Sequence, residues 1–309
     1  MFARYNHISL KGFLAAVPDN LVSIRELMEK SSPEDRFTLK RVAALAGLEQ
    51  RYACPAHLYT GDLALGAARK ILESLDWDPQ SLGALFFVSQ TPDFLSPPTG
   101  YLIGGALGVD KNCFVTDVSS GCPGMIHGAL LASALMGENC RRALILSGDA
   151  ASKTIPQGDI GNSVLMGDAV GALALEFDAD APPVAFNTLG FPDTDLSLVN
   201  YNSGYRPMDG DLDGMVMDGN RITEFCLSSA PECIRGLLDR EGLTLDDIEI
   251  LFLHQPNKMI LDTLARRLKV DKKRVPMIFR NYANCSSASL PINVCSCDHK
   301  ADGPRLALF

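Results

Sequence analysis

Cys122 stands in a run of small residues, SSGCPG, directly before the apolar stretch from Met125 to Met136. A thiol at the start of a helix faces unpaired backbone N–H groups and the positive end of the helix dipole, and both favour the thiolate. The flanking glycines let backbone approach a substrate carbonyl closely, and proline suits a first helical turn. The pattern predicts a nucleophilic cysteine, although a turn cysteine before a buried helix can also serve packing alone.

Two further polar side chains follow apolar segments in the second half of the chain. His254 comes directly after the run IEILFL, and Asn284 stands in NYANCSSASLP before a series of small residues. A lone histidine in such a place is often a structural residue, and asparagine readily caps a helix. Together with Cys122, however, they would supply a nucleophile and two hydrogen-bonding groups able to stabilise an oxyanion or an enolate.

Short apolar runs rich in β-forming residues alternate with helical patterns along the chain. The runs are LGALFFVSQ, CFVTDV, ALILSGDA and ALALEF, followed later by IEILFLHQ, VPMIF and LALF. This alternation predicts an α/β fold with buried, largely parallel strands. Ligand sites of such folds gather at the carboxyl ends of strands, where Cys122, His254 and Asn284 all stand. We therefore expect the three side chains to face one cavity.

The chain divides into two halves that resemble each other. Residues 178–183, DADAPP, are acidic and carry prolines, and they mark the expected boundary between residues 1–177 and residues 178–309. In each half, a helix (63–75 or 231–238) leads to a strand that ends in Gln with Pro close behind. A second strand then runs into a small-residue turn and an apolar helix. The repeat predicts a duplicated α/β unit.

Composition and charge narrow the class of protein. With 309 residues, of which 47% are hydrophobic, the chain can bury a large core, and a net charge of −9 argues against a general nucleic-acid surface. We find no signal-like segment and no long uncharged apolar run, so we expect a cytoplasmic protein with no membrane partner.

The cysteines are not arranged as disulfide or metal frameworks. The nine cysteines are scattered along the chain, so we expect reduced thiols. The tail CSCDH (Cys295, Cys297, His299) lacks the paired spacing of a zinc site, so we expect no metal.

Six motifs, in order along almost the whole chain, resemble the β-ketoacyl-acyl-carrier-protein synthase III family of the thiolase superfamily. They are TPDFLSPPT, DVSSGCPGM, LMGDAVGALAL, MDG at 217–219, LHQPN and YANCSSASLP. The resemblance implies a layered αβαβα thiolase-like fold of two duplicated halves, assembled as a homodimer. It also implies a Cys-His-Asn triad at Cys122, His254 and Asn284. In that family the cysteine takes an acyl group from a thioester, and a malonyl group on acyl-carrier protein then loses carbon dioxide and condenses with it.

The resemblance also implies residues for binding. Phe94 matches an aromatic that reaches toward the partner subunit's acyl pocket, and Arg266 and Arg267 match basic residues that receive the carrier. A local basic surplus beginning at Lys258 agrees with docking of an acidic carrier protein, although any single residue there can be part of an ordinary solvated helix face. The chemistry implies no cofactor, with an acyl-coenzyme A or acyl-carrier thioester as substrate.

Departures from the family pattern and competing functions remain open at this point. Residues 35–53 hold no tryptophan, where the family often has one around the coenzyme A adenine, and position 123 is proline. The family continues into a glycine-rich loop and a last strand beyond PRLALF, so we expect a second half without them.

The alternatives to the condensing reaction are transfer of the acyl group to an oxygen or nitrogen acceptor and a non-catalytic thiolase-fold subunit. A papain-type peptidase would carry C-G-S-C-W, which does not occur.

Overall fold

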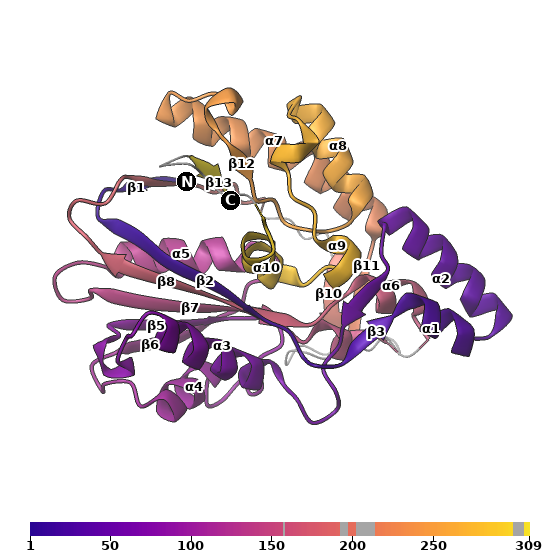
Figure 1. Ribbon diagram of the computed structural model, residues 1–309, viewed down its shortest axis with the longest axis horizontal. Coiled ribbons are helices and arrows are strands. Elements are labelled where there is room, and N and C mark those ends of the chain that lie inside the picture. Colours follow the sequence, from indigo (N-terminus) through magenta and orange to yellow (C-terminus); the bar gives the residue numbers. More distant parts are fainter. Residues whose placement is uncertain (157, 192–196, 202–213, 299–305) are drawn as a thin grey trace.

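The computed structural model describes residues 1–156, 158–191, 197–201, 214–298 and 306–309. Its elements form layers that alternate helices with strands (Figure 1). In that view α3 and α4 lie below a central sheet, α5 and α10 lie above it, and short strands followed by α7 and α8 complete the upper part. The layered α/β arrangement expected from the sequence is confirmed.

The central sheet carries the strands predicted for the first half. Its order is β2–β8–β7–β5–β6, in which β5 runs parallel to β6 and β7, while β8 is antiparallel to both β7 and β2. The strands are β2 (Ile8–Ala16), β5 (Ala84–Val88), β6 (Phe114–Val118), β7 (Arg142–Asp149) and β8 (Ala169–Phe177). Because β5, β6 and β7 are parallel, their carboxyl ends meet at one edge of the sheet, as the sequence predicts.

Each face of this sheet is covered by its own pair of helices. Leu85 and Leu144 point toward one core, which α3 (Thr60–Ser74) and α4 (Thr99–Leu107) cover. Phe86 and Ile145 point to the other face, toward α5 (Gly124–Leu135) and α10 (Ser289–Cys295). Alternate strand residues thus enter opposite cores, which is why the strands read as continuous apolar runs rather than as alternating ones.

The second half is built around shorter strands. Strand β12 (Ile250–Leu251) pairs in parallel with β13 (Ala307–Leu308), and β1 (Phe2–Tyr5) pairs antiparallel with β9 (Val184–Asn187). Helices α7 (Gly219–Glu241) and α8 (Lys258–Leu268) pack over β12 through an apolar core that includes Leu251 and Leu261. Across the described parts of the chain, no helix is both long and apolar enough to cross a membrane.

The remaining elements form a flank beside the two halves, to the right in Figure 1. Their bounds are α1 (Ile24–Lys30), α2 (Pro33–Ala46), α6 (Ile160–Leu165), α9 (Phe279–Tyr282), β3 (Leu21–Ser23), β4 (Gln50–Tyr52), β10 (Leu198–Tyr201) and β11 (Gly214–Met217). Short 3-10 turns are η1 (Pro79–Ser81), η2 (Ala151–Thr154), η3 (Leu245–Asp247), η4 (Lys272–Arg274) and η5 (Ser286–Ala288). The pairs β3–β4 and β10–β11 are antiparallel.

One expected strand is wrong and one expected helix is longer than predicted. The segment VPMIF forms no strand, because its backbone groups bond to side-chain amides instead of to a neighbouring strand. Gln255 Nε2 and Asn293 Nδ2 each donate to the Pro276 carbonyl at 3.2 Å, and the Ile278 N–H donates to Gln255 Oε1 at 3.0 Å. The helix expected over 231–238 is α7, which begins at Gly219 and contains Pro231 within it.

The boundary predicted at 178–183 lies in the connection between β8 and β9. Strand β1, at the beginning of the chain, pairs with β9 beyond that boundary. The N-terminal strand therefore lies beside elements of the second half, and the division into residues 1–177 and 178–309 stays a prediction.

Candidate active site

Cys122 lies between the end of β6 and the start of α5, with Pro123 at the N-cap. The turn closes through a hydrogen bond from the Gly124 N–H to the Gly121 carbonyl at 2.7 Å. Glycine is required at 124 because a Cβ there would lie 2.9 Å from Val88 Cγ1 and 3.2 Å from Ser287 Cβ. The beginning of α5 is thereby pressed against both the central sheet and a turn of the second half.

His254 follows β12, and its neighbours fix the backbone on both sides of it. Gln255 Nε2 donates to the Leu253 carbonyl at 2.9 Å, and Gln255 is itself fully buried. Burial lowers the pKa of His254 to about 4, against the opposing effect of a hydrogen bond with the Ser286 backbone. The imidazole is therefore neutral at pH 7, with one N–H to donate and one nitrogen to accept. Its Nδ1 is buried and has no partner among the described residues.

Asn284 is held in a tight loop between α9 and η5. Its N–H donates to the Leu165 carbonyl and its carbonyl accepts from the Gly167 N–H, both at 2.9 Å. Ala283 and Ser286, on either side, adopt positive φ values of 62° and 50°. Non-glycine residues adopt this conformation at an energetic cost, and such strain tends to gather at functional sites. The loop therefore aims the Asn284 side chain by backbone contacts rather than by its own packing.

Ser286 is the residue at which the three candidate side chains converge. Its N–H donates to Asn284 Oδ1 at 2.9 Å. Its backbone raises the pKa of His254 and its side chain lowers the pKa of Cys122, so both residues lie close to it, while Ser286 Oγ makes no hydrogen bond within the described residues. Cys122 comes from the first half, whereas His254 and Asn284 come from the second. The structure thus brings the three residues to one place, and their catalytic roles stay a prediction.

The thiol of Cys122 behaves differently from the expectation based on the helix dipole. Its pKa is raised to about 12, chiefly by desolvation and then by the negative charge of Asp149 and by Cys226, while Ser286 lowers it. Cys122 nevertheless keeps an exposed surface, so a reagent can reach it. Desolvation of the sulfur thus acts against the dipole of α5, and the expectation of a ready thiolate stays a prediction.

Four residues that support the site had no role in the sequence interpretation. Ser286 and Asn293 stand within and after the quoted motif YANCSSASLP, Gln255 follows His254, and Asp149 stands near the end of the run ALILSGDA. Motif spacing could mark the first three as neighbours of the site. Their partners, however, come from distant segments, so only the fold reveals their contacts.

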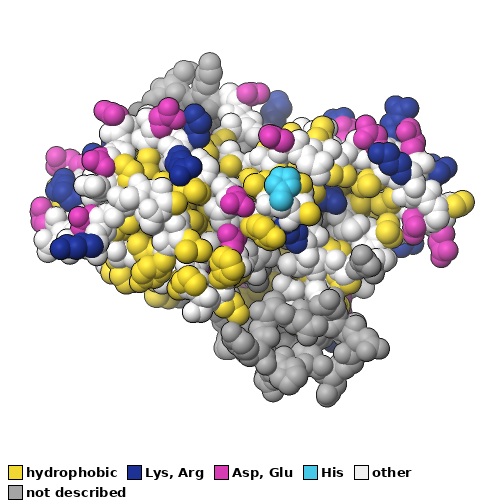
Figure 2. All heavy atoms as spheres, turned by 90° about the horizontal axis from the view of Figure 1, so that it is seen from below, with side chains coloured by type: hydrophobic (Ala, Val, Ile, Leu, Met, Phe, Trp, Pro, Cys, Tyr) yellow, Lys and Arg dark blue, Asp and Glu magenta, His cyan; other side chains and the backbone are white. Residues whose placement is uncertain are grey.

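Phe94 lines a cavity of about 600 Å³ beside the Cys122 turn. Its walls include Gln90 and Ser119 on one side and Asp93 and Lys153 on another. The ring of Phe94 is 57% exposed, and Leu95 is 59% exposed. Figure 2 shows hydrophobic side chains gathered on the face that carries α3 and α4. Two exposed apolar side chains, Phe94 and Leu95, thus line this cavity.

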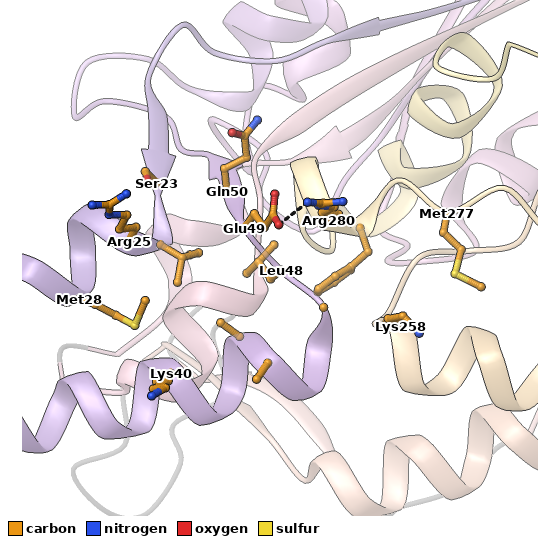
Figure 3. Close-up of a pocket in the computed structure, with 15 residues that line it drawn as sticks. Ser23, Arg25, Met28, Lys40, Leu48, Glu49, Gln50, Lys258, Met277 and Arg280 are labelled. Atoms are coloured by element: carbon orange, nitrogen blue, oxygen red, sulfur yellow. Dashed lines mark hydrogen bonds and ion pairs between the residues drawn. The ribbon is translucent and has the colours of Figure 1, made fainter.

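The basic residues predicted for docking lie at the two ends of α8. Lys258 is in the first turn of α8 and lines a second cavity of about 850 Å³ between α2 and α8 (Figure 3). Arg266 and Arg267 are in the last turn of α8, and Arg267 donates to the Leu227 carbonyl of α7 at 2.7 Å. Their role in docking stays a prediction.

Lys258 instead shares its cavity with basic residues from other elements. Arg25, Lys40 and Arg280 also line it, and Glu49 is the carboxylate among the lining residues. Glu49 pairs with Arg280 at 2.5 Å, and Lys258 pairs with Asp262 on its own helix. Leu48 and Phe279 form part of an apolar floor. The rim is thus predominantly basic.

No group of three or more His, Cys, Asp or Glu side chains is arranged to hold a metal ion in the described part of the chain. Of the tail CSCDH, His299 lies outside the described residues.

Comparison with known proteins defines the class of this fold and its site. Residues 116–188 match the family described as 3-oxoacyl-[acyl-carrier-protein (ACP)] synthase III, and residues 238–304 match its C-terminal counterpart. A crystal structure of 3-oxoacyl-(acyl-carrier protein) synthase from Burkholderia xenovorans LB400 superposes with a TM-score of 0.90 at 28% identity, over 95% of this chain and 86% of that chain.

Related sequences lead to the same family. The β-ketoacyl-[acyl-carrier-protein] synthase III of Clostridium perfringens (strain SM101 / Type A) is 30% identical over 294 residues, covering 92% of this chain and 88% of that protein. The protein of the same name from Erythrobacter litoralis is 28% identical over 288 residues, covering 92% and 88%. The fold and site define a thiolase-like α/β protein. The chain belongs to the β-ketoacyl-[acyl-carrier-protein] synthase III family.

Proposed function

We propose that this protein is an acyltransferase that takes an acyl group from a thioester onto Cys122 and condenses it with a malonyl-carrier thioester. Fatty acid synthesis or a related pathway would use such a product. The convergence of Cys122, His254 and Asn284 on Ser286 carries this proposal, since it joins a nucleophile to two hydrogen-bonding groups across the two halves. Membership of the synthase III family supports it.

In the first step, the sulfur of Cys122 attacks the thioester carbonyl and expels the donor thiolate, which leaves a new thioester on the protein. Because the pKa of the thiol is raised to about 12, a proton acceptor must assist the attack. The Nδ1 of neutral His254 has no hydrogen-bond partner among the described residues, so it can accept that proton and pass it to the departing donor thiolate, which leaves the imidazole neutral for the second step. Exchange of one thioester for another is close to balanced in energy, so the step needs neither a metal nor a flavin.

In the second step, the malonyl group loses carbon dioxide, and the electron pair of the broken bond forms an enolate. The enolate carbon attacks the acyl carbonyl, and the sulfur of Cys122 leaves as the carbon–carbon bond forms. Negative charge collects on an oxygen in both events. The N–H of neutral His254 and the Nδ2 of Asn284 are suited to donate to that oxygen, and loss of one such donor costs about 10²–10³ in rate.

The surroundings of Phe94 support an acyl pocket beside a homodimer interface. Strand β6 is at the edge of the central sheet, and Phe114 on it is 51% exposed. Exposed apolar residues also stand on α4, which packs against β6, and just before it: Phe94, Leu95, Tyr101 and Leu102. An unpaired strand edge with an apolar border favours pairing with another chain. We propose that a second copy covers it and that Phe94 contacts the acyl pocket of the partner.

We propose that the acyl-carrier protein docks on the basic side of the second half. Carrier proteins are acidic, so a basic rim would guide their approach. The cavity beside Lys258 supports this side, because Lys40 and Arg25 of the first half also line it, although Arg25 pairs with Glu29 and Arg280 with Glu49. Arg266 and Arg267 would contribute at the other end of that helix. Helix α8 begins four residues after His254, which connects docking with the site.

Intact-mass measurement tests the first step. The protein is mixed with a panel of acyl-coenzyme A and acyl-carrier thioesters, and we expect one acyl adduct that is absent from Cys122→Ala. Cys295→Ala, which removes another exposed thiol, is the matched control and should keep the adduct. An adduct that persists in Cys122→Ala would refute the assignment of the nucleophile.

Addition of malonyl-carrier tests the second step. We expect release of carbon dioxide and a β-ketoacyl product in equal amounts. If the adduct forms but an oxygen or nitrogen acceptor takes the acyl group without carbon dioxide release, the protein is an acyltransferase of the same fold. If no adduct forms with any donor, the non-catalytic alternative is favoured.

A further inference from the structure

Two fully buried side-chain amides, those of Gln255 and Asn293, meet around the backbone that leads into His254. Gln255 Nε2 donates to the carbonyl of Leu253 at 2.9 Å and to that of Pro276 at 3.2 Å. Asn293 Nδ2 donates to the same two carbonyls, at 3.5 Å and 3.2 Å respectively. Two amides from different segments thus share two carbonyls, and one of these carbonyls belongs to the residue directly before His254.

The two amides differ in how completely they are paired. Gln255 Oε1 accepts from the Ile278 N–H at 3.0 Å, so both ends of that amide have partners. Asn293 Oδ1 is buried and has no partner among the described residues. A buried acceptor without a partner lowers the stability of a protein, and its presence calls for an explanation other than stability. We look for that explanation in the segments that Asn293 connects.

Asn293 belongs to α10, a helix that is held tightly against the central sheet (Figure 1). Its residues from Ser289 to Asn293 are all buried, and the helix packs against β2 and β8. The contact with β8 is so close that a Cβ at Gly171 would lie 2.0 Å from Pro291 Cγ. A group that bonds to Asn293 is therefore held in place relative to the sheet of the first half.

The beginning of α10 also holds the loop that carries Asn284. The Cys285 N–H, directly after Asn284, donates to Ser289 Oγ at 3.2 Å, and Ser289 is the first residue of α10. Asn293 stands about one helical turn further along and bonds to the Leu253 carbonyl. One short helix thus contacts the chain beside Asn284 and the chain beside His254.

We propose that Asn293 is a positioning residue, which ties the chain before His254 to α10 and so fixes the imidazole relative to Asn284. Gln255 does not replace it. Gln255 joins its own segment to residues 276–278, and Asn293 is the member of the pair that comes from α10. The consequence for catalysis rests on the proposed function, whereas the placement of His254 does not.

The placement of His254 can be tested without an acyl donor. Asn293→Leu removes the Nδ2 donor and the unpaired Oδ1, and both carbonyls keep their bonds from Gln255. In protein labelled with carbon-13 at its five histidines, the ring signal of His254 is the one missing from His254→Gln. We expect this signal to shift in Asn293→Leu. Asn187→Leu, which removes an amide that donates to the Cys233 carbonyl at 2.9 Å, is the matched control and should leave it in place.

An unmoved His254 signal in folded Asn293→Leu, or an equal shift in the control, would overturn the proposal. If the wild type forms no acyl adduct, the proposed function fails, and this spectrum alone decides the role of Asn293.

The rates of the two chemical steps test the consequence for catalysis. His254 takes part in both steps, whereas Asn284 takes part in condensation alone. We expect Asn293→Leu to slow adduct formation and condensation alike, by about 10–100-fold, with the donor concentration at half-maximal rate unchanged. Slower condensation with normal adduct formation would show that Asn293 acts on the Asn284 loop rather than on His254, and would refute the proposal.

Asn293→Asp separates the hydrogen bond from packing, and it decides the question if Asn293→Leu does not fold. The introduced carboxyl can donate to the two carbonyls only while it is protonated, a form that burial favours. Its rates, divided by those of the wild type at the same pH, should therefore rise as the pH is lowered from 8 to 6. The same ratio for Asn293→Leu should stay constant. A ratio for Asn293→Asp that does not rise would contradict a role for the hydrogen bond.

Discussion

The hydroxyl of Ser147 on β7 donates a hydrogen bond of 2.7 Å to the hydroxyl of Ser287 in η5. Both side chains are essentially without solvent contact. Ser147 belongs to the central sheet of the first half, and Ser287 directly follows Ser286, on which the candidate catalytic residues converge. This bond therefore joins the sheet behind Cys122 to the turn that follows Asn284.

Ser147→Ala should destabilise the protein by about 1–3 kcal/mol, because it leaves the Ser287 hydroxyl buried without its partner. The double variant Ser147→Ala/Ser287→Ala should regain part of that loss, which chemical denaturation of all four proteins would measure. Ser133→Ala is the matched control: Ser133 is equally buried in α5, and its hydroxyl has no partner among the described residues. An equally large loss of stability in Ser133→Ala would show that the destabilisation does not come from the unpaired Ser287 hydroxyl.

Asn284→Ala should lower the condensation rate by about 10²–10³ while the acyl adduct on Cys122 still forms, whereas His254→Ala should slow both adduct formation and condensation, because His254 is also the proposed proton acceptor of the first step. Asn284→Asp distinguishes the two functions of this side chain. It keeps the Oδ1 that accepts from the Ser286 N–H but removes the Nδ2 donor. We expect it to fold like the wild type and to lose condensation. His57→Ala, at an exposed histidine, should have no effect; normal carbon dioxide release in Asn284→Asp would exclude the donor role.

The stability of the protein should fall on acidification between pH 6.5 and about pH 4. His254 has a lowered pKa of about 4 when folded, against an ordinary value of 6.5, so only the unfolded chain binds the proton in that interval. Unfolding is then favoured as pH decreases, by an amount on the order of 2–3 kcal/mol. Urea unfolding of the wild type and of His254→Gln across this range measures the effect. The difference between the two should shrink toward low pH, and parallel curves would argue against a buried neutral imidazole.

Gly171→Ala should destabilise the protein by about 1–3 kcal/mol through overpacking. A Cβ at Gly171 on β8 would overlap the ring of Pro291 in α10, the helix that follows the Asn284 loop. Thermal unfolding measures the change. Gly105→Ala, in α4, meets nothing within 4 Å and should be stabilising by less than about 1 kcal/mol. If both variants have the same melting temperature, the close approach of α10 to the sheet is not as described.

The double charge reversal Lys40→Glu/Lys258→Glu should weaken binding of acyl-carrier protein about tenfold or more at low ionic strength, mainly through slower association. The effect should diminish with added salt, because exposed charges are screened. Lys111→Glu/Lys70→Glu, at exposed lysines of the first half, is the matched control. Surface plasmon resonance with immobilised carrier measures both. Equal loss in the control pair would show that net charge, rather than this rim, governs binding.

The sequence alone predicts the elements whose residue patterns depend only on near neighbours in the chain. All four strands expected in the first half are present, and β5, β7 and β8 read as apolar runs because both of their faces are buried, whereas β6 lies at the sheet edge. Cys122 could be singled out from eight other cysteines because glycine and proline surround it at the start of a helix. The strand expected over VPMIF fails for a non-local reason: its backbone is held by the amides of Gln255 and Asn293, which come from other segments.

By itself, the sequence determined that this is an α/β protein of the synthase III family with a cysteine, a histidine and an asparagine at the ends of predicted strands. Residue type and spacing suffice for that, because helix and strand periodicity and turn chemistry act over a few neighbours. Only the tertiary structure decided that the three meet around Ser286. Cys122 comes from the first half and the other two from the second, so their closeness, and the burial that lowers the pKa of His254, exist only once the two halves have packed together.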